Sequence, residues 1–211
     1  MTPIPLLIAI TFLLSLSPPT TATTDSVLDT KGHPLKPNTP YYILPVYRGR
    51  GGGLTMSPKN TTSPCPLYAA QSSSELSKGK PVKLYPVNYP TQNKVTLSTD
   101  MNFVFAAFAT GCRQSTGWQL TLDEETGRRY VGLGVVTAPP GPATVSNWFR
   151  VEKSGSGIYD YKIVFCPSVC NFCKVACGDV GVFVNDDGKR LLGFNGLGST
   201  PQTLLVRFVK V

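Results

Sequence analysis

The sequence predicts an all-β protein built from short strands. Glycine and proline are numerous, with 20 and 19 of them among 211 residues, and both favour turns over long helices. Short runs rich in Val, Thr, Tyr and Phe alternate with these turns, which is the pattern of strands in a sandwich or barrel. With 41% hydrophobic and 15% charged residues, the chain has enough apolar material for one domain with a packed core.

The strands can be placed in order along the chain from Val27 onward. We expect about a dozen of them, separated by turns that begin with the triple glycine Gly51-Gly52-Gly53 and end with Asp186-Asp187-Gly188. No strict internal repeat and no break in composition marks a second domain, so residues 25–211 are expected to form one unit. The clearest strand patterns are Tyr41–Val46, Val82–Tyr85, Lys94–Ser98, Phe103–Ala107, Trp118–Leu122, Tyr130–Val135, Trp148–Lys153, Tyr161–Phe165, Val180–Val184 and Leu204–Val209.

Residues 1–24 have the character of a secretory signal peptide. Ile4 to Leu16 is almost continuously apolar, and small and helix-breaking residues follow it. This apolar stretch is too short for a spanning helix, and we expect cleavage between Ala22 and Thr24. No later stretch is apolar enough to cross a membrane. The mature protein is therefore expected to be soluble and exported, to the extracellular space (the apoplast) or to a vacuole.

The six cysteines form an even set in an oxidising route, which predicts three disulfides. The last four have the spacing CxxxCxxCxxxC, which would suit a zinc site in a reducing compartment, but no histidine lies near them. We therefore expect disulfides and no metal. Six cysteines allow fifteen pairings, and a nested pair among the last four is one arrangement that their spacing permits. The cysteines are Cys65, Cys112, Cys166, Cys170, Cys173 and Cys177.

Charge and motif content argue against two further classes of function. The formal charge is +8, but the Lys and Arg are scattered, so a nucleic-acid surface is not expected and the charge could only steer an acidic partner. The sole histidine, His33, lies in a turn and has no triad around it, which argues against an enzyme. Asp186-Asp187 lacks the ligand spacing of a calcium loop. No cofactor is expected.

One ordinary N-glycosylation sequon is present, Asn60-Thr61-Thr62. A second candidate, Asn38-Thr39, is excluded because Pro40 follows it. In an exported protein we expect Asn60 on an exposed loop, where it is a glycosylation site.

Several sequence blocks resemble one plant family. The opening VLDTKGHPLKPNTPYYIL (27–44) is similar to the signature of the Kunitz soybean trypsin inhibitor family, and GRGGGLTM (49–56), STDMNFVF (98–105) and NWFRVEK (147–153) continue the match. The block YKIVFCPSVCNFCKVACGDVGVFV (161–184) is most similar to the miraculin-like branch. The resemblance covers essentially the whole mature chain. It implies a β-trefoil of about twelve strands and the disulfides Cys65–Cys112, Cys166–Cys177 and Cys170–Cys173.

The resemblance also implies a function and a site. Members of the family block a secreted peptidase, usually of the serine type, with an exposed loop that enters the cleft as an extended substrate and is already held in its bound shape. By position this loop is Pro86, Val87, Asn88, Tyr89, Pro90 and Thr91 here. Tyr89 stands at the pocket-filling position, with Asn88 as the alternative if the alignment shifts by one residue.

The loop and the position that supports it depart from the family. The loop contains no Lys or Arg, so trypsin is not favoured, whereas a chymotrypsin-like target is compatible with Tyr89. Pro90 follows the anchor, a placement that serine peptidases tolerate poorly, and Pro37 stands where the family has its loop-supporting Asn, with Asn38 adjacent. The alternative for the loop is that its two prolines only stiffen a turn.

Other functions of the same scaffold stay open. They are a non-inhibitory defence protein, a carbohydrate-binding trefoil, and an inhibitor of cysteine peptidases or of α-amylase. A basic loop, Arg48-Gly49-Arg50, precedes the triple glycine and is expected to be solvated. No seventh cysteine is present to link subunits, so a monomer is expected.

Overall fold

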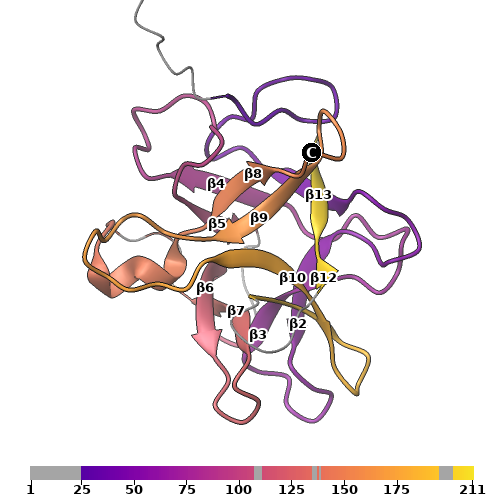
Figure 1. The fold of residues 1–211 in the computed structure, drawn as a ribbon. Coiled ribbons are helices and arrows are strands. Elements are labelled where there is room, and N and C mark those ends of the chain that lie inside the picture. The colour runs from indigo at the N-terminus through magenta and orange to yellow at the C-terminus, as the bar shows by residue number, and fades with distance from the viewer. Residues whose placement is uncertain (1–24, 107–110, 135–136, 138, 195–201) are drawn as a thin grey trace, which may run out of the picture.

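The computed structural model describes residues 25–106, 111–134, 137, 139–194 and 202–211, and the regular secondary structure in this part of the chain is almost entirely β-strand (Figure 1). The expected signal peptide, residues 1–24, lies outside the described residues, as do Ala107 and Val135 at the ends of two expected strands. The described elements are β1 (Tyr41–Pro45), β2 (Leu54–Pro58), β3 (Leu67–Gln71), β4 (Val82–Pro86), β5 (Met101–Phe105), β6 (Gly117–Leu122), β7 (Arg129–Gly134), the 3-10 helix η1 (Pro142–Asn147), β8 (Arg150–Lys153), β9 (Tyr161–Phe165), β10 (Gly178–Val184), β11 (Arg190–Phe194), β12 (Gln202–Thr203) and β13 (Leu205–Lys210).

Six of the thirteen described strands form a closed barrel. β1 pairs with both β13 and β4, β4 pairs with β5, β13 pairs with β9, and β9 pairs with β8. A bridge between Met101 in β5 and Phe149 just before β8 joins the two ends of this series. The barrel therefore has no open edge at which another chain would add a strand.

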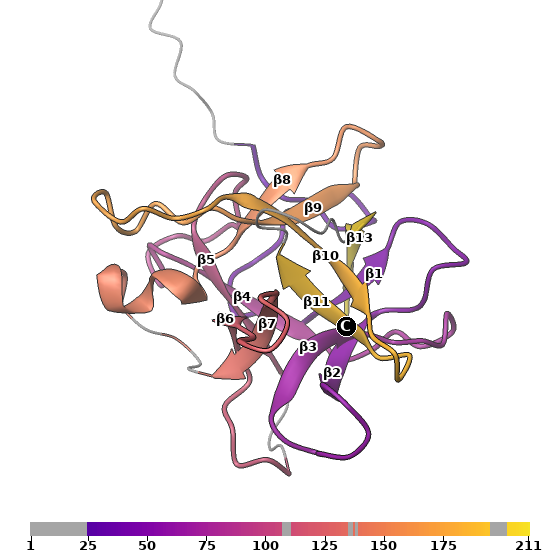
Figure 2. The ribbon, with the colours of Figure 1, turned by 60° about the horizontal axis from the view of Figure 1, so that its bottom comes forward.

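Three hairpins cap one end of this barrel: β2–β3, β6–β7 and β10–β11. Their inner strands pair with one another in a triangle, through Tyr68 with Gly132, Tyr130 with Gly193, and Leu191 with Ala70. In Figure 2, β3, β7 and β11 lie around the centre of the view. Three similar hairpins over a six-stranded barrel constitute a β-trefoil, so the fold implied by the family resemblance is confirmed.

Aromatic side chains fill the barrel where the strands converge. Trp118 stacks on Phe103 with 4.8 Å between ring centroids, and Phe149 meets both rings edge-on. A separate buried cluster under the cap centres on Tyr130 and Phe183. Such contacts favour burial beyond the transfer of apolar area from water, by about 1 kcal/mol for each pair.

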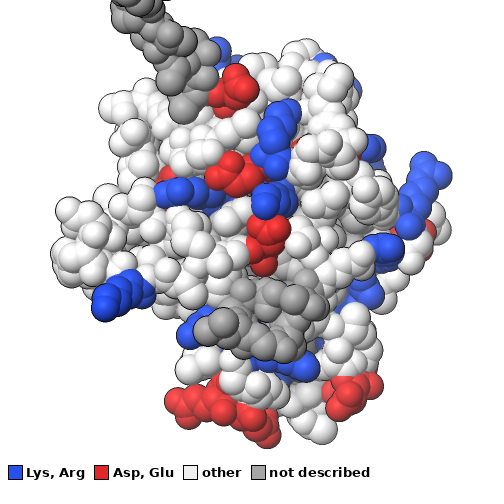
Figure 3. Space-filling model, viewed as in Figure 1, with Lys and Arg blue, Asp and Glu red and all other residues white. Residues whose placement is uncertain are grey.

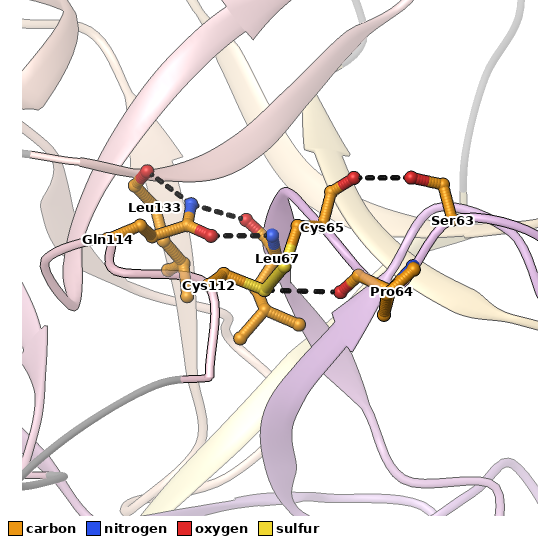
Figure 4. Close-up of a disulfide and its surroundings, with 7 residues drawn as sticks. All are labelled: Ser63, Pro64, Cys65, Leu67, Cys112, Gln114 and Leu133. Atoms are coloured by element: carbon orange, nitrogen blue, oxygen red, sulfur yellow. Dashed lines mark hydrogen bonds between the residues drawn. A yellow bond between two sulfur atoms is a disulfide. The ribbon is translucent and has the colours of Figure 1, made fainter.

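The structure has three disulfides: Cys65–Cys112, Cys166–Cys177 and Cys170–Cys173. They are the pairs that the resemblance implies, and they use the thiols that a zinc site would need. Figure 4 shows that Cys65–Cys112 ties the segment before β3 to the segment before β6. Beside it the Gln114 amide donates to the carbonyls of Leu67 and Leu133 and accepts from the Leu67 N–H. The Gln114 side chain and the disulfide therefore hold the β2–β3 hairpin against the β6–β7 hairpin.

A buried carboxylate links the turn before β9 to the last strand of the barrel. Asp160 is 3% exposed and accepts hydrogen bonds from the Arg207 side chain in β13 and from the Ser156 hydroxyl. The hydrogen bond from Arg207 lowers the pKa of Asp160, while burial acts in the opposite direction. The ionised form of Asp160 therefore favours the folded state.

We expect Asp160→Asn to destabilise the protein in a pH-dependent way. Because its pKa is lowered in the folded state, Asp160 contributes stability above its ordinary value of 3.8, and this contribution is lost as the pH falls through the lowered value. Urea denaturation at about pH 7 should show a loss of about 1 kcal/mol, because Arg207 is partly solvated. The difference between the two proteins should shrink as the pH is lowered below 3.8. A difference that does not change with pH would contradict this role.

The charged side chains are dispersed over the molecule. On the face shown in Figure 3, Lys and Arg lie in small groups among neutral and acidic side chains, and acidic residues gather at the tip of the β6–β7 hairpin. This distribution agrees with the scattered basic residues of the sequence. In the part of the chain that the structure describes, no helix has the length and apolar character needed to cross a membrane.

Candidate functional site

The expected contact loop, Pro86 to Thr91, lies in the connection between β4 and β5, at the end of the barrel away from the cap hairpins. Pro86 is the last residue of β4 and is buried, and Val87 is half-buried. Asn88, Pro90 and Thr91 are exposed, and Tyr89 is 41% exposed. The middle of the loop is therefore available to a partner, whereas its first two residues belong to the scaffold.

The main chain of this loop folds into two successive turns. The Tyr89 N–H donates to the Pro86 carbonyl at 2.8 Å, and the N–H groups of Thr91 and Gln92 donate to the Asn88 carbonyl at 3.0 and 3.1 Å. The Thr91 hydroxyl donates to the same carbonyl at 2.6 Å. The loop is thus not in the extended form that the family resemblance implies, because these peptide groups bond within the loop.

Tyr89 is held against the barrel by its neighbours. Its ring meets the Tyr85 ring edge-on, with 5.3 Å between centroids. The Asn38 amide donates to the Tyr89 hydroxyl at 3.4 Å, and the Tyr85 hydroxyl donates to the Asn38 carbonyl oxygen at 2.7 Å. Burial raises the pKa of Tyr85, and Tyr89 adds to the effect, so the Tyr85 hydroxyl stays protonated and able to donate. One asparagine therefore positions both tyrosines.

Asn38 reaches this position because of an unusual backbone conformation. Its φ is 56°, in the left-handed region that Asn tolerates better than most residues. Its N–H donates to the Leu84 carbonyl in β4 at 3.0 Å, which anchors the segment beside the loop. The sequence shows Pro37 at the position of the family's supporting Asn, and the structure gives the supporting contacts to the next residue.

The start of the loop is fixed by Asp100, which the sequence analysis did not single out. The Val87 N–H donates to the Asp100 carbonyl at 2.8 Å. The Asp100 carboxylate is 4% exposed on its side chain and pairs with Arg150 at 2.7 Å. It also accepts from the N–H and the hydroxyl of Ser168, at 2.8 and 2.7 Å. The available signal was an acidic residue directly before an apolar strand in the block STDMNFVF.

A hollow of ≈ 300 Å³ adjoins the loop. Tyr85 and Tyr89 form one wall, and Pro139, Pro140 and Trp148 form the other. The Pro-rich turn before η1 therefore lies beside the contact loop, and the hollow is lined by uncharged residues that include the aromatic side chains of Tyr85, Tyr89 and Trp148.

The remaining candidate residues lie elsewhere. Asn60 is on the loop between β2 and β3, where its side-chain oxygen accepts from the Thr62 hydroxyl and the Ser63 N–H. The His33 side chain is 74% exposed and is 3.7 Å from Asp29. Asp186 and Asp187 are exposed in the turn between β10 and β11. Among the described residues, no group of three or more His, Cys, Asp and Glu side chains is placed to hold a metal ion.

The triple glycine after Arg50 is packed against its surroundings. Gly52 and Gly53 are buried, and a Cβ on Gly53 would lie 2.0 Å from the Lys78 carbonyl oxygen. No side chain fits there, so the glycines serve close approach of two backbones.

Comparison with known proteins identifies the family of this chain. Residues 27–210 match the model of the Kunitz legume family, described as trypsin and protease inhibitors. The chain belongs to this family. It is 45% identical to miraculin from Synsepalum dulcificum over 80% of this chain and 78% of that protein. It is 44% identical to Kunitz trypsin inhibitor 5 from Arabidopsis thaliana over 82% of each.

A solved structure of a relative has the same fold. The rice bifunctional α-amylase/subtilisin inhibitor from Oryza sativa is 38% identical, with a TM-score of 0.67 over 90% of this chain and 100% of that chain. The family is one of protease inhibitors, some of which also act on amylase or subtilisin, and not one of enzymes. Membership therefore agrees with the expectation, based on the single histidine, that this chain is not an enzyme.

Proposed function

We propose that this protein is a secreted, monomeric inhibitor of serine peptidases that accept large apolar or aromatic side chains, such as chymotrypsin and subtilisin. The proposal includes removal of residues 1–24 as a signal peptide, export to the apoplast or a vacuole, and glycosylation at Asn60. The loop from Pro86 to Thr91 blocks the peptidase cleft, with Tyr89 as the side chain that fills the specificity pocket.

The observation that carries this proposal is the support of Tyr89 by Asn38 and Tyr85. A side chain that is already held in one place loses little conformational entropy on binding, so more of its contact energy contributes to affinity. The exposed part of the loop carries no charge, and its one aromatic ring suits an apolar pocket. The subtilisin-inhibiting relative from rice supports this choice of target.

The turns within the loop affect how the loop binds. An extended substrate pairs its main chain with the peptidase, but the Pro86 and Asn88 carbonyls already accept hydrogen bonds inside the loop. We therefore propose that the loop docks as a folded turn, and that the contact depends on the Tyr89 side chain more than on main-chain pairing.

A panel of enzymes tests the proposed function. The oxidised protein without residues 1–24 should inhibit chymotrypsin and subtilisin in a stoichiometric titration. Trypsin should be inhibited at least about 100-fold more weakly, because no cation is present for its acidic pocket. Inhibition of papain or α-amylase alone would overturn the proposal and favour those targets, and no inhibition of any enzyme by folded protein would exclude an inhibitory role against this panel.

We expect Asn38→Gly to weaken inhibition without unfolding the protein. Glycine keeps the left-handed backbone conformation and removes only the side chain that contacts both tyrosines. Loss of the two hydrogen bonds between the Asn38 side chain and the tyrosines should raise the inhibition constant about 10-fold. Melting temperature and inhibition constant should be measured together. An unchanged inhibition constant would show that Tyr89 needs no support from Asn38.

A further inference from the structure

A second and larger hollow lies away from the contact loop. Its volume is ≈ 730 Å³, within the range of small-molecule sites. Its walls come from the segment after β1, from the end of β3, and from β10 to β12, and they include Tyr47, Arg50, Gln71, Val182, Arg190 and Leu204. It shares no residue with the loop from Pro86 to Thr91.

The polar side of this hollow is built around Arg190. Its guanidinium donates from Nε and Nη2 to the Gln71 side-chain oxygen, at 3.2 and 2.9 Å. Nη2 also donates to the Arg50 carbonyl at 2.7 Å. A Cβ on Gly51, whose φ is 92°, would lie 3.0 Å from Arg190 Nε. The first glycine of the triple therefore makes room for this guanidinium, which is held in one orientation.

The guanidinium groups of Arg190 and Arg50 are hydrogen-bond donors, and no carboxylate of the described residues pairs with them. Among the described residues, neither Arg190 nor Arg50 belongs to an ion pair. Gln71 is 3% exposed, and its Nε2 is buried without a hydrogen-bond partner in the described part of the chain. An unpartnered buried donor beside an unneutralised cation is costly. Gln71 Nε2 is closed off from solvent, so the group that an anion in the hollow would neutralise is the Arg190 guanidinium.

Apolar side chains line the hollow beside Arg190, and Val184 is its cross-strand neighbour. Val182 and Val184 of β10 line the hollow together with Leu204 and Leu205, and Val184 is 56% exposed. The Tyr47 ring, 52% exposed, lies under the Arg50 guanidinium at 5.9 Å. A ligand that fills the hollow therefore needs both an acidic group and an apolar body.

We propose that this hollow binds an organic carboxylate with an apolar body. Arg190 holds the carboxylate through Nη1, the guanidinium nitrogen that is not already bonded to Gln71 or to the Arg50 carbonyl, in a charge-assisted hydrogen bond. Gln71 orients Arg190, and the valine and leucine side chains cover the apolar body. Arg50, which the sequence suggests is a solvated loop residue, contributes positive charge at the rim.

Decanoate is a suitable probe. Decanol, which lacks the carboxylate, and acetate, which lacks the long chain, are its controls. Calorimetric titration of the oxidised protein should give one site with a dissociation constant on the order of 100 µM for decanoate. Decanol and acetate should each bind at least about 10-fold more weakly, because one lacks the charge and the other the apolar body. Amide signals of Val182, Val184 and Leu204 should shift on titration.

Arg190→Met and Arg48→Met form a matched pair of variants. Both remove one arginine, but Arg48 does not line the hollow. Arg190→Met should weaken decanoate binding at least about 10-fold, and Arg48→Met should leave it unchanged. No decanoate binding to wild type, equal binding of decanol, or equal binding to a folded Arg190→Met variant would overturn the proposal. The decanoate titration uses no peptidase, so a negative result leaves the proposed inhibitory function unaffected.

Discussion

Replacing Tyr89 with alanine should raise the inhibition constants for chymotrypsin and subtilisin about 100-fold, or about 3 kcal/mol. Tyr89 is the aromatic side chain that the loop offers to a partner, and anchor residues of this kind carry much of the binding free energy. Because the loop makes its own main-chain hydrogen bonds, little main-chain pairing is available to compensate for the lost ring.

Two control variants separate the possible causes of that effect. Tyr89→Phe removes the hydroxyl that accepts from Asn38 and keeps the ring, so inhibition should stay within about 10-fold of wild type. Leu122→Ala shortens a side chain that is 58% exposed on β6, outside the contact loop, and inhibition should be unchanged. If Tyr89→Ala inhibits as well as wild type, Tyr89 is not the anchor and Asn88→Ala becomes the variant to measure.

Replacing Cys65 and Cys112 together with serine should cost about 4 kcal/mol of folding free energy by the loop-entropy estimate. The two cysteines are 47 residues apart, so the bond restricts a long segment of the unfolded chain. It also ties β3 to the segment before β6, next to Gln114 (Figure 4). Chemical denaturation at equilibrium measures the loss.

The double variant of Cys170 and Cys173 is the matched comparison. These cysteines are separated by 3 residues, so the same estimate gives only about 2 kcal/mol. Equal losses for the two double variants would contradict the account based on loop length, and would show that local strain or packing decides the contribution of each disulfide.

Much of the fold could be predicted from the sequence. Most strands lie where expected, but the prediction of a strand at Lys94–Ser98 was wrong, because its main chain bonds to the irregular segment 25–35 and Thr96 forms only an isolated bridge. The cysteine pairs are those of the family. The trefoil itself could not be predicted from periodicity, because its three hairpins share a pairing pattern rather than residues. β2, β3 and β11 lack clear strand patterns because Ser, Pro, Ala and Gly occupy them, and pairing within the cap stabilises them instead.

The location of the site could be predicted from the sequence, but its conformation could not. Position along the chain indicated the loop and Tyr89, but no pattern could show that the loop is a pair of turns, since that depends on which carbonyls its N–H groups reach. Phe172 is 75% exposed although most aromatic residues are buried, because it lies in the tight loop closed by Cys170 and Cys173. Asp100 and Gln71 act through partners far away in the sequence, which a single sequence does not reveal.

The most direct test of the inhibitory site is an NMR map of the complex with subtilisin. In isotope-labelled protein at one equivalent of subtilisin, the amide signals of Asn88, Tyr89 and Thr91 and the side-chain amide of Asn38 should shift most. Signals of the β6–β7 hairpin should stay in place. Shifts confined to other loops, with the signals of the loop from Pro86 to Thr91 unchanged, would contradict the proposal that this loop blocks the peptidase.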